Sequence, residues 1–386
     1  MSRRGVIGRM TGWGLLLAIV EAASTAGGAE PIRIGGLVET SGGLATLGVP
    51  LLEGARLALE EVNAAGGING QPLELVNLNT ESDETKAVIN AKKLIEQEKV
   101  VVIIGPAATG ENLAITPTIL GAGVPLVANG AAQAIVTPAE QKRWIFKVPL
   151  SDVLVQEKLL AHMKTRGIER IALINSDVGF GVTGREALEK LAPTTGIRLV
   201  LQQTFGVNDQ DMSAQVTRTR ASDAQATVLW ATNPGQAIVV KNYRQLAVPK
   251  PLYLSHAAND FRFLQLAGPA ANGVFLGSSK IYIVDQLPAG DPQKAVIERF
   301  VKAYQAKYNK TPATFSGNGY DALMIAAEGL RRGGTDRTKV RDAIEGLKGH
   351  AGITGIYSFS PTDHAGLQPE SVVVLEVRDG KWMLAQ

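Results

Sequence analysis

Apolar and polar positions follow two alternating patterns along the chain after Pro31. Short β-rich runs such as residues 32–38 alternate with stretches such as residues 50–63, in which apolar side chains recur every three to four residues. The continuous apolar run at residues 100–104, closed by Gly105, is typical of a strand covered on both faces. We therefore expect successive β-α-β units, which build parallel sheets through right-handed crossovers.

The same alternation restarts near residue 150. A predicted helix over residues 152–165 leads into further β-α-β units, which end with a strand at residues 252–255. Helical patterns dominate residues 291–347, and an Asp-Gly pair at residues 379–380 predicts a tight hairpin turn. Two such series predict an α/β protein with two lobes.

A leader that directs export is expected over residues 1–29. Three arginines among the first nine residues precede a short apolar stretch, Trp13–Val20, and small residues follow it up to Ala29. This order is typical of a secretory signal peptide, although Glu21 departs from it. The alternative is a disordered tail. With a signal peptide, the cysteine-free chain suits the bacterial periplasm.

Composition narrows the class of protein. Apolar residues make up 45% and charged residues 19%, which indicates a globular chain. The 39 Lys and Arg residues barely exceed the 36 Asp and Glu residues and form no dense basic stripe, so a nucleic-acid partner is not expected. The absence of cysteine excludes disulfides, thiolate metal sites and thiol catalysis.

No motif for catalysis, nucleotide binding or metal binding is complete. Residues 105–110 have the glycine spacing of a phosphate loop, but Glu111 and Asn112 follow where Lys and Ser/Thr are required. Asn79, Glu81 and Asp83 offer oxygen ligands but lack the glycine of a calcium loop, so they are expected in turns and helix caps. The chain also has no nucleophile elbow and no H-E-x-x-H. His350 and His364 are interpreted as surface loop residues. We expect no catalysis, no cofactor and no metal.

Polar or small residues follow most of the predicted strands. Ligands of open α/β sheets bind beyond the carboxyl ends of the strands. Thr109 and the amides after Val127 could hold a carboxylate, because a helix start supplies unpaired N–H groups. Each position alone is explained as well by a turn or a cap, but together they predict a cleft that closes on a small ligand. The positions are Ser41–Gly43, Ala108–Thr109, Asn129–Ala132, Asp177–Phe180, Thr232–Asn233 and Ser255–His256.

Residues 59–73, which read LEEVNAAGGINGQPL, carry a family resemblance. They are similar to the LA-E-[IV]-N-A-x-GGI-x-G stretch of periplasmic substrate-binding proteins of ABC importers, of the leucine/isoleucine/valine-binding type. The resemblance extends over essentially everything after residue 30. Supporting stretches are Ser41-Gly42, Ile103–Gly105, Val124-Pro125 and Ser360–Leu367.

The resemblance implies two Rossmann-like lobes with parallel sheets joined by a three-stranded hinge, with crossovers near residues 149, 276 and 358. It also implies hinge closure on a ligand, a monomer, delivery of the ligand to an inner-membrane ABC permease, and no catalysis. A sensor that presents its ligand state to a receptor uses the same cleft and stays open as an alternative. The implied lobes are residues 30–149 with 277–358, and residues 150–276 with 359–386.

The same resemblance implies the ligand-binding positions. The hydroxyl that grips a ligand carboxylate falls at Thr109, and the loop whose backbone donates to it falls at Gly130–Ala132, with Ala132 where the amino-acid binders have Thr. Phe180 and Phe315 fall on the side-chain pocket. Leu47 and Asn233 each stand where the family has a Tyr. The full set is Ser41, Leu47, Ala108, Thr109, Gly130, Ala131, Ala132, Phe180, Asn233, His256 and Phe315.

His256 falls where the family has the acid that pairs with a ligand ammonium. A buried ammonium needs a countercharge, which His cannot provide, whereas His can donate to a carboxylate, hydroxyl or carbonyl. Similar branches with a Ser-His-x-x-Asn stretch like residues 255–259 take up aromatic or other organic acids. We therefore favour a carboxylate ligand without a free α-amine. The alternative is a branched-chain amino acid, with a slipped alignment that makes Asp260 the acid.

Overall fold

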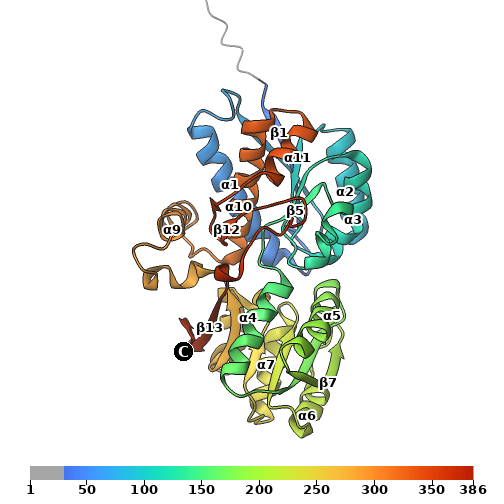
Figure 1. The fold of residues 1–386 in the computed structure, drawn as a ribbon, viewed down its shortest axis with the longest axis vertical. Coiled ribbons are helices and arrows are strands. Elements are labelled where there is room, and N and C mark those ends of the chain that lie inside the picture. Colours follow the sequence, from blue (N-terminus) through green and yellow to red (C-terminus); the bar gives the residue numbers. More distant parts are fainter. Residues whose placement is uncertain (1–29, 386) are drawn as a thin grey trace, which may run out of the picture.

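The computed structural model describes residues 30–385, which form two α/β lobes stacked along the long axis of the molecule (Figure 1). The leader expected over residues 1–29 lies outside the described residues. Within the described part of the chain, no helix is both long enough and apolar enough to cross a membrane. The predicted fold class, two lobes built on parallel sheets, is confirmed.

Lobe one is built on a five-stranded parallel sheet with the order β2-β1-β3-β4-β5. Its strands are β1 (Ile32–Val38), β2 (Leu73–Asn79), β3 (Val102–Ile104), β4 (Leu126–Ala128) and β5 (Ile145–Lys147). Val102 and Ile104 pack into the core on one face and Ile103 into the core on the other. This confirms the strand that the sequence predicted to be covered on both faces.

Helices cover both faces of the lobe-one sheet (Figure 1). On these faces α2 packs against α3, and α10 packs against both α1 and α11. A carbon atom attached to Gly54 of α1 would lie 1.8 Å from the carbonyl oxygen of Ser316 of α10, so only glycine allows this approach. The helices are α1 (Ala45–Ala64), α2 (Glu84–Glu96), α3 (Thr109–Ala122), α9 (Lys294–Tyr308), α10 (Thr314–Gly333) and α11 (Arg337–Glu345).

Lobe two is built on a seven-stranded sheet with the order β14-β13-β10-β9-β8-β6-β7. Five strands are parallel: β6 (Arg170–Ser176), β7 (Arg198–Phe205), β8 (Ala226–Trp230), β9 (Leu252–Leu254) and β10 (Val274–Ser278). The last two, β13 (Val373–Arg378) and β14 (Lys381–Leu384), form the predicted C-terminal hairpin.

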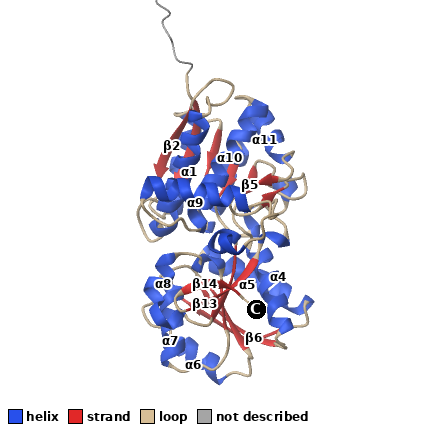
Figure 2. Cartoon of the chain, turned by 90° about the vertical axis from the view of Figure 1, so that its left-hand side faces the viewer, coloured by secondary structure: helices blue, strands red, loops and turns tan. Residues whose placement is uncertain are grey.

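Helices also lie on both sides of the lobe-two sheet, with α6 to α8 on one side and α4 on the other (Figure 2). They are α4 (Asp152–Thr165), α5 (Gly179–Thr194), α6 (Ser213–Ala221), α7 (Gly235–Gln245) and α8 (Phe261–Ala267). The chain passes between the lobes after β5, after β10 and after β12 (Ile356–Tyr357), which pairs with β11 (His350–Ala351). Short 3-10 helices are η1 (Gln133–Ile135), η2 (Ala139–Gln141), η3 (His256–Ala258), η4 (Gly268–Ala271), η5 (Lys280–Gln286) and η6 (Pro369–Ser371).

Two local predictions are wrong. The helix expected from Pro50 begins at Ala45, and Pro50 lies inside it, although proline is favoured at helix starts. His364 is buried rather than a surface loop residue. Its burial is tolerated because both ring nitrogens have partners: Nδ1 lies 2.9 Å from the carbonyl oxygen of Ile145, and Nε2 lies 3.2 Å from Oε1 of Glu345.

Candidate functional site

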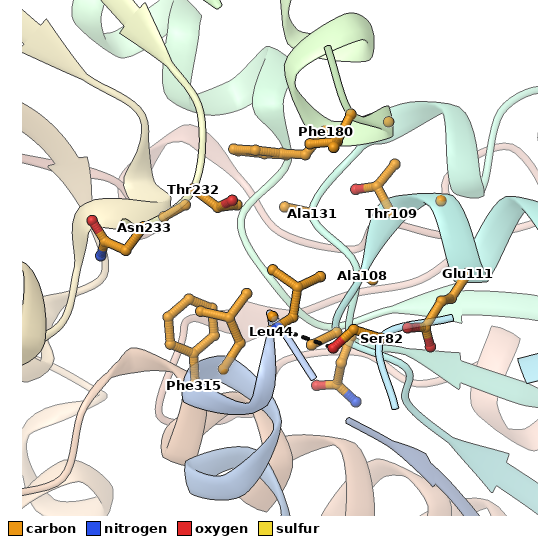
Figure 3. Close-up of a pocket in the computed structure, with 18 of the residues that line it drawn as sticks. Leu44, Ser82, Ala108, Thr109, Glu111, Ala131, Phe180, Thr232, Asn233 and Phe315 are labelled. Atoms are coloured by element: carbon orange, nitrogen blue, oxygen red, sulfur yellow. Dashed lines mark hydrogen bonds between the residues drawn. The ribbon is translucent and has the colours of Figure 1, made fainter. Parts of the chain in front are cut away.

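A cavity of about 450 Å³ lies between the lobes, and both lobes contribute to its walls (Figure 3). The carboxyl ends of strands and the starts of helices α1, α3, α5, α7 and α10 meet there, as the arrangement of open α/β sheets requires. Each helix start brings unpaired N–H groups and the positive end of a helix dipole. These helix ends are the features of the cavity that attract negative charge.

Thr109, the first residue of α3, lies on the lobe-one side of the cavity (Figure 3). The two preceding amides, of Ala107 and Ala108, already donate to the Glu39 carboxylate at 3.2 and 2.7 Å. The amides of Thr109, Gly110 and Glu111 and the Thr109 hydroxyl make no hydrogen bond to any other described residue. The start of α3 thus keeps three N–H donors and a hydroxyl for a ligand.

Glu111 also lies on the cavity wall, and its buried carboxyl lies beside the Thr80 side chain and the Glu39 carboxyl. Burial raises the pKa of Glu111 to about 9, and the neighbouring Glu39 charge raises it as well. Burial also raises the pKa of Glu39. At neutral pH this carboxyl pair therefore holds a proton, so Glu111 does not bring a full negative charge into the cavity.

Phe180 of α5 and Phe315 of α10 form apolar walls on two sides of the cavity (Figure 3). The Phe180 ring packs against Trp230, with centroids 5.6 Å apart, and meets the His256 ring edge-to-face at 5.5 Å. Leu47 of α1 adds to the apolar lining. The cavity is thus apolar between its polar ends.

His256 opens η3 after strand β9, and its buried ring faces the Leu150 backbone. Burial lowers the pKa of His256 to about 3, and the charge of Lys147 lowers it further, while hydrogen bonding to the Leu150 backbone acts in the opposite direction. His256 is therefore uncharged at physiological pH. A neutral imidazole offers one donor and one acceptor.

Lys147 lies behind this wall, at the end of β5. Its side chain is fully buried and donates to the Pro149 carbonyl oxygen. Burial lowers the pKa of Lys147 to about 7, although Asp152 and Asp363 act to raise it. The charge of this amine acts on His256, and no Lys or Arg is among the described residues that line the cavity.

Asp260, the alternative acid for a ligand ammonium, is not on the cavity wall. Its Oδ1 accepts from the Phe263 amide at 2.7 Å and caps α8, and burial raises its pKa. The neighbouring Asn259 does line the cavity. Its side-chain amide nitrogen donates to the Gly277 carbonyl oxygen at 3.0 Å, while Oδ1 has no partner within the described chain.

The structure brings eight of the eleven predicted positions to the cavity and leaves three beside it. Ser41 is exposed, and its hydroxyl accepts from Nδ2 of Asn79 at 2.8 Å. Gly130 packs closely against Asn112, and Ala132 is buried in the core of lobe one. Their part in binding stays a prediction. The eight are Leu47, Ala108, Thr109, Ala131, Phe180, Asn233, His256 and Phe315.

Several lining residues were not predicted as ligand contacts. In the sequence, Glu111 stands out only as a mismatch to a phosphate loop, and Asn259 only as the end of the Ser-His-x-x-Asn stretch. Thr314 immediately precedes the predicted Phe315, which is the one signal that could have found it. Asp83, by contrast, caps α2 as predicted, accepting from the Lys86 amide at 2.7 Å. No cluster of three metal-ligating side chains occurs in the described part of the chain.

Comparison with known proteins gives consistent similarities. A family model described as periplasmic binding protein matches residues 31–381. Leu/Ile/Val-binding protein homolog 7 of Brucella abortus is 27% identical over 382 residues, which cover 95% of this chain and 94% of that protein. An extracellular ligand-binding receptor from Rhodopseudomonas palustris superposes with a TM-score of 0.85 at 26% identity, covering 92% of this chain and 99% of the other. The branched-chain amino acid transporter substrate-binding protein LivJ from Streptococcus pneumoniae, solved with isoleucine, has a TM-score of 0.81 at 25% identity, with 92% and 99% covered.

Proposed function

The chain belongs to the periplasmic binding protein family, and from this premise we propose that it captures a small carboxylate ligand between its lobes and delivers it to an inner-membrane ABC permease. It acts as a non-catalytic monomer in the periplasm. Its lobes comprise residues 30–149 with 277–358, and residues 150–276 with 359–386. Closure of the lobes about the connecting segments encloses the ligand.

The observation that carries this proposal is the cavity between the lobes into which five helices point their N-terminal ends. A carboxylate gains from the unpaired N–H groups and the positive helix ends without any Lys or Arg on the wall. At α3, the Thr109 hydroxyl and the three free amides from Thr109 to Glu111 supply the donors. Because Glu111 keeps a proton at neutral pH, it does not repel a carboxylate held beside it.

We propose further that the ligand is an organic acid without an α-amine, with an aromatic acid favoured. A desolvated ammonium needs a countercharge. His256 is neutral, Asp260 caps α8 and does not line the cavity, and Glu84, which does line it, is exposed. Phe180 and Phe315 suit a flat apolar body. The other candidate is a branched-chain amino acid, which the names of the relatives and the isoleucine complex of the Streptococcus pneumoniae protein favour.

A thermal-shift screen of the purified protein against amino acids and against aromatic, aliphatic and dicarboxylic acids tests both statements. A ligand at 100 times its dissociation constant stabilises the fold by about 2.7 kcal/mol, which shifts the melting temperature measurably. Shifts with organic acids alone support the amine-free ligand, and tight binding of leucine with weak binding of acids refutes it. Thr109→Val removes the gripping hydroxyl and should weaken binding, whereas Thr118→Val, on α3 but outside the cavity lining, serves as the matched control.

A further inference from the structure

Two glycines meet across the mouth of the cavity, one from each lobe. Gly110 lies in the first turn of α3, and Gly179 is the first residue of α5. A carbon atom attached to Gly179 would lie 3.1 Å from the Gly110 amide nitrogen and 3.3 Å from the Gly110 Cα. Carbon atoms in ordinary contact lie about 3.5–4.0 Å apart, so Gly179 has no room for a side chain. We call this backbone approach the glycine contact.

The start of α3 cannot move away from lobe two on its own. The side-chain amide of Asn112 donates to the carbonyl oxygens of Pro106 and Ala108, each at 2.8 Å, and so fixes the loop that enters the helix. The atoms of Gly110 that face lobe two belong to the backbone, which cannot rotate aside as a long side chain can. A side chain added from lobe two would therefore meet a rigid surface.

The start of α5 is fixed in the same way. A carbon atom attached to Gly181 would lie 2.1 Å from the Ser176 carbonyl oxygen, so the first turn of α5 packs directly on the end of β6. The Asp177 amide donates to the Phe205 carbonyl oxygen at 3.0 Å, which ties the connecting loop to β7. Because neither helix start can yield locally, a side chain on Gly179 would have to part the two lobes.

The glycine contact also brings together two helix ends of the same sign. Helices α3 and α5 contact each other across the cavity, and both present their N-terminal ends there. Each end carries a partial positive charge of about half an elementary charge, so the approach of the two ends is opposed by their repulsion. An anion held in the cavity reduces this repulsion. A bound carboxylate should therefore favour the arrangement in which the two glycines touch.

We propose that closure of the lobes ends at the glycine contact, and that the missing side chain of Gly179 determines how far the lobes close. Gly179 is then a positioning residue, which acts on ligand affinity through the population of closed molecules. The apparent affinity of a ligand falls in proportion to the fraction of molecules that can bind it. This inference rests on the proposed function, in which closure of the lobes encloses the ligand.

Disulfide trapping tests the contact itself, and it needs no ligand. The chain has no cysteine, so a disulfide in Gly110→Cys/Gly179→Cys can join only the two introduced residues. The Cα atoms of the two glycines are no more than about 4.8 Å apart, since a carbon one bond of about 1.5 Å from the Gly179 Cα lies 3.3 Å from the Gly110 Cα. Disulfides join Cα atoms about 4.4–6.8 Å apart, so we expect the pair to oxidise readily. The control pair Gly121→Cys/Gly179→Cys should stay reduced, because Gly121 lies about 16 Å further along α3.

Gly179→Leu tests the consequence. Spin labels on Lys92→Cys of α2 and Glu186→Cys of α5, both exposed, report the distance between the lobes. The shortest distance population of the labelled parent should be lost in Gly179→Leu and kept in the control Gly121→Leu, whose added side chain meets open space. The affinity for leucine or benzoate, whichever binds the parent, should fall at least about tenfold in Gly179→Leu.

The melting temperature without ligand separates closure from folding. Leucine is a better helix former than glycine, so the melting temperature of Gly179→Leu should not fall. If it does fall, the distances are measured in Gly179→Ala, which adds only the carbon atom that meets Gly110 and should still shorten the life of the closest population.

The outcomes separate this inference from the proposed function. Failure of Gly110→Cys/Gly179→Cys to form a disulfide, or lobe distances that the substitutions of Gly179 leave unchanged, overturns the inference even where benzoate or leucine binds the parent. A disulfide together with the loss of the shortest distances supports it. If both are found while neither leucine nor benzoate changes the distances or the melting temperature of the parent, the proposed ligand is overturned and the glycine contact stands.

Discussion

The buried amine of Lys147 should make the stability of this protein depend on pH in a specific direction. Burial lowers the pKa of Lys147 from its ordinary value of 10.5 to about 7. Below pH 7 the amine is charged in both the folded and the unfolded chain, so the folded chain bears the full cost of burying the charge. Between pH 7 and 10.5 only the unfolded chain keeps the proton, so the free energy of unfolding rises with pH.

The size of this effect follows from the two pKa values. Each pKa unit corresponds to about 1.4 kcal/mol, so the whole interval is on the order of 5 kcal/mol. Lys147→Met removes the titrating group and keeps an unbranched side chain of similar length. Relative to this variant, the parent protein should gain about 3 kcal/mol in free energy of unfolding between pH 7 and pH 9.5. The comparison cancels the titration of all other groups that the substitution leaves undisturbed.

Urea denaturation of both proteins at half-unit pH steps measures the difference. Lys147→Met also removes the charge that acts on the buried Asp152 carboxyl, which shifts the free energy of unfolding of the variant. This shift does not create the rise with pH that the parent shows above pH 7. The exposed Lys158→Met should run parallel to the parent at every pH. Parallel curves for Lys147→Met and the parent protein would refute the reasoning, since they would show that the buried amine titrates near its ordinary pKa.

Three further predictions address packing, the carboxyl pair and ligand choice. Gly54→Ala should destabilise the protein by about 1–3 kcal/mol or more in urea denaturation, because its new methyl group would lie 1.8 Å from the Ser316 carbonyl oxygen. The control is Gly121→Ala on α3, whose methyl group meets nothing within 4 Å, so this variant should be neutral or stabilising. The free energy of unfolding of Glu111→Gln should rise relative to that of the parent as pH rises from 4.5 towards 9. In this range the folded parent keeps the Glu111 proton while the unfolded parent loses it, which destabilises the parent. Equal pH profiles would contradict the raised pKa of Glu111. His256→Asp places a carboxylate on the cavity wall, so the affinity for leucine should improve at least several-fold relative to that for its deaminated acid. Unchanged relative affinities in a titration would argue against His256 as the position that decides whether an amine binds.

The elements that depend on local pattern could be predicted from the sequence. Strand β3 shows this, since an uninterrupted apolar run has no polar face to leave in water and must be covered on both sides. The C-terminal hairpin and the Asp83 cap also follow from local backbone preferences. Pro50 misled the prediction because proline favours helix starts, whereas α1 accommodates it one turn later.

The candidate site could be predicted only in part, because a strand end specifies a place but not the direction of each side chain. Thr109 and His256 reach the cavity, as their positions after strands predicted. Ala132 follows a strand in the same way, yet it points into the core. Thr314 escaped this reasoning because it comes from a helix that is placed at the cavity by packing against α1, and no local pattern encodes that contact.

The packing of α1 against α10 also determines the order in which the newly made chain can be completed. Helix α10 is synthesised about 250 residues after α1, so the inner face of α1 has no cover while the intervening chain emerges from the ribosome. The five parallel strands of lobe two, by contrast, lie within residues 170–278 and can assemble earlier. Domains usually fold as units from the N-terminus onwards during synthesis. Here the lobe that begins first must wait for α10, which is made after the parallel strands of the other lobe.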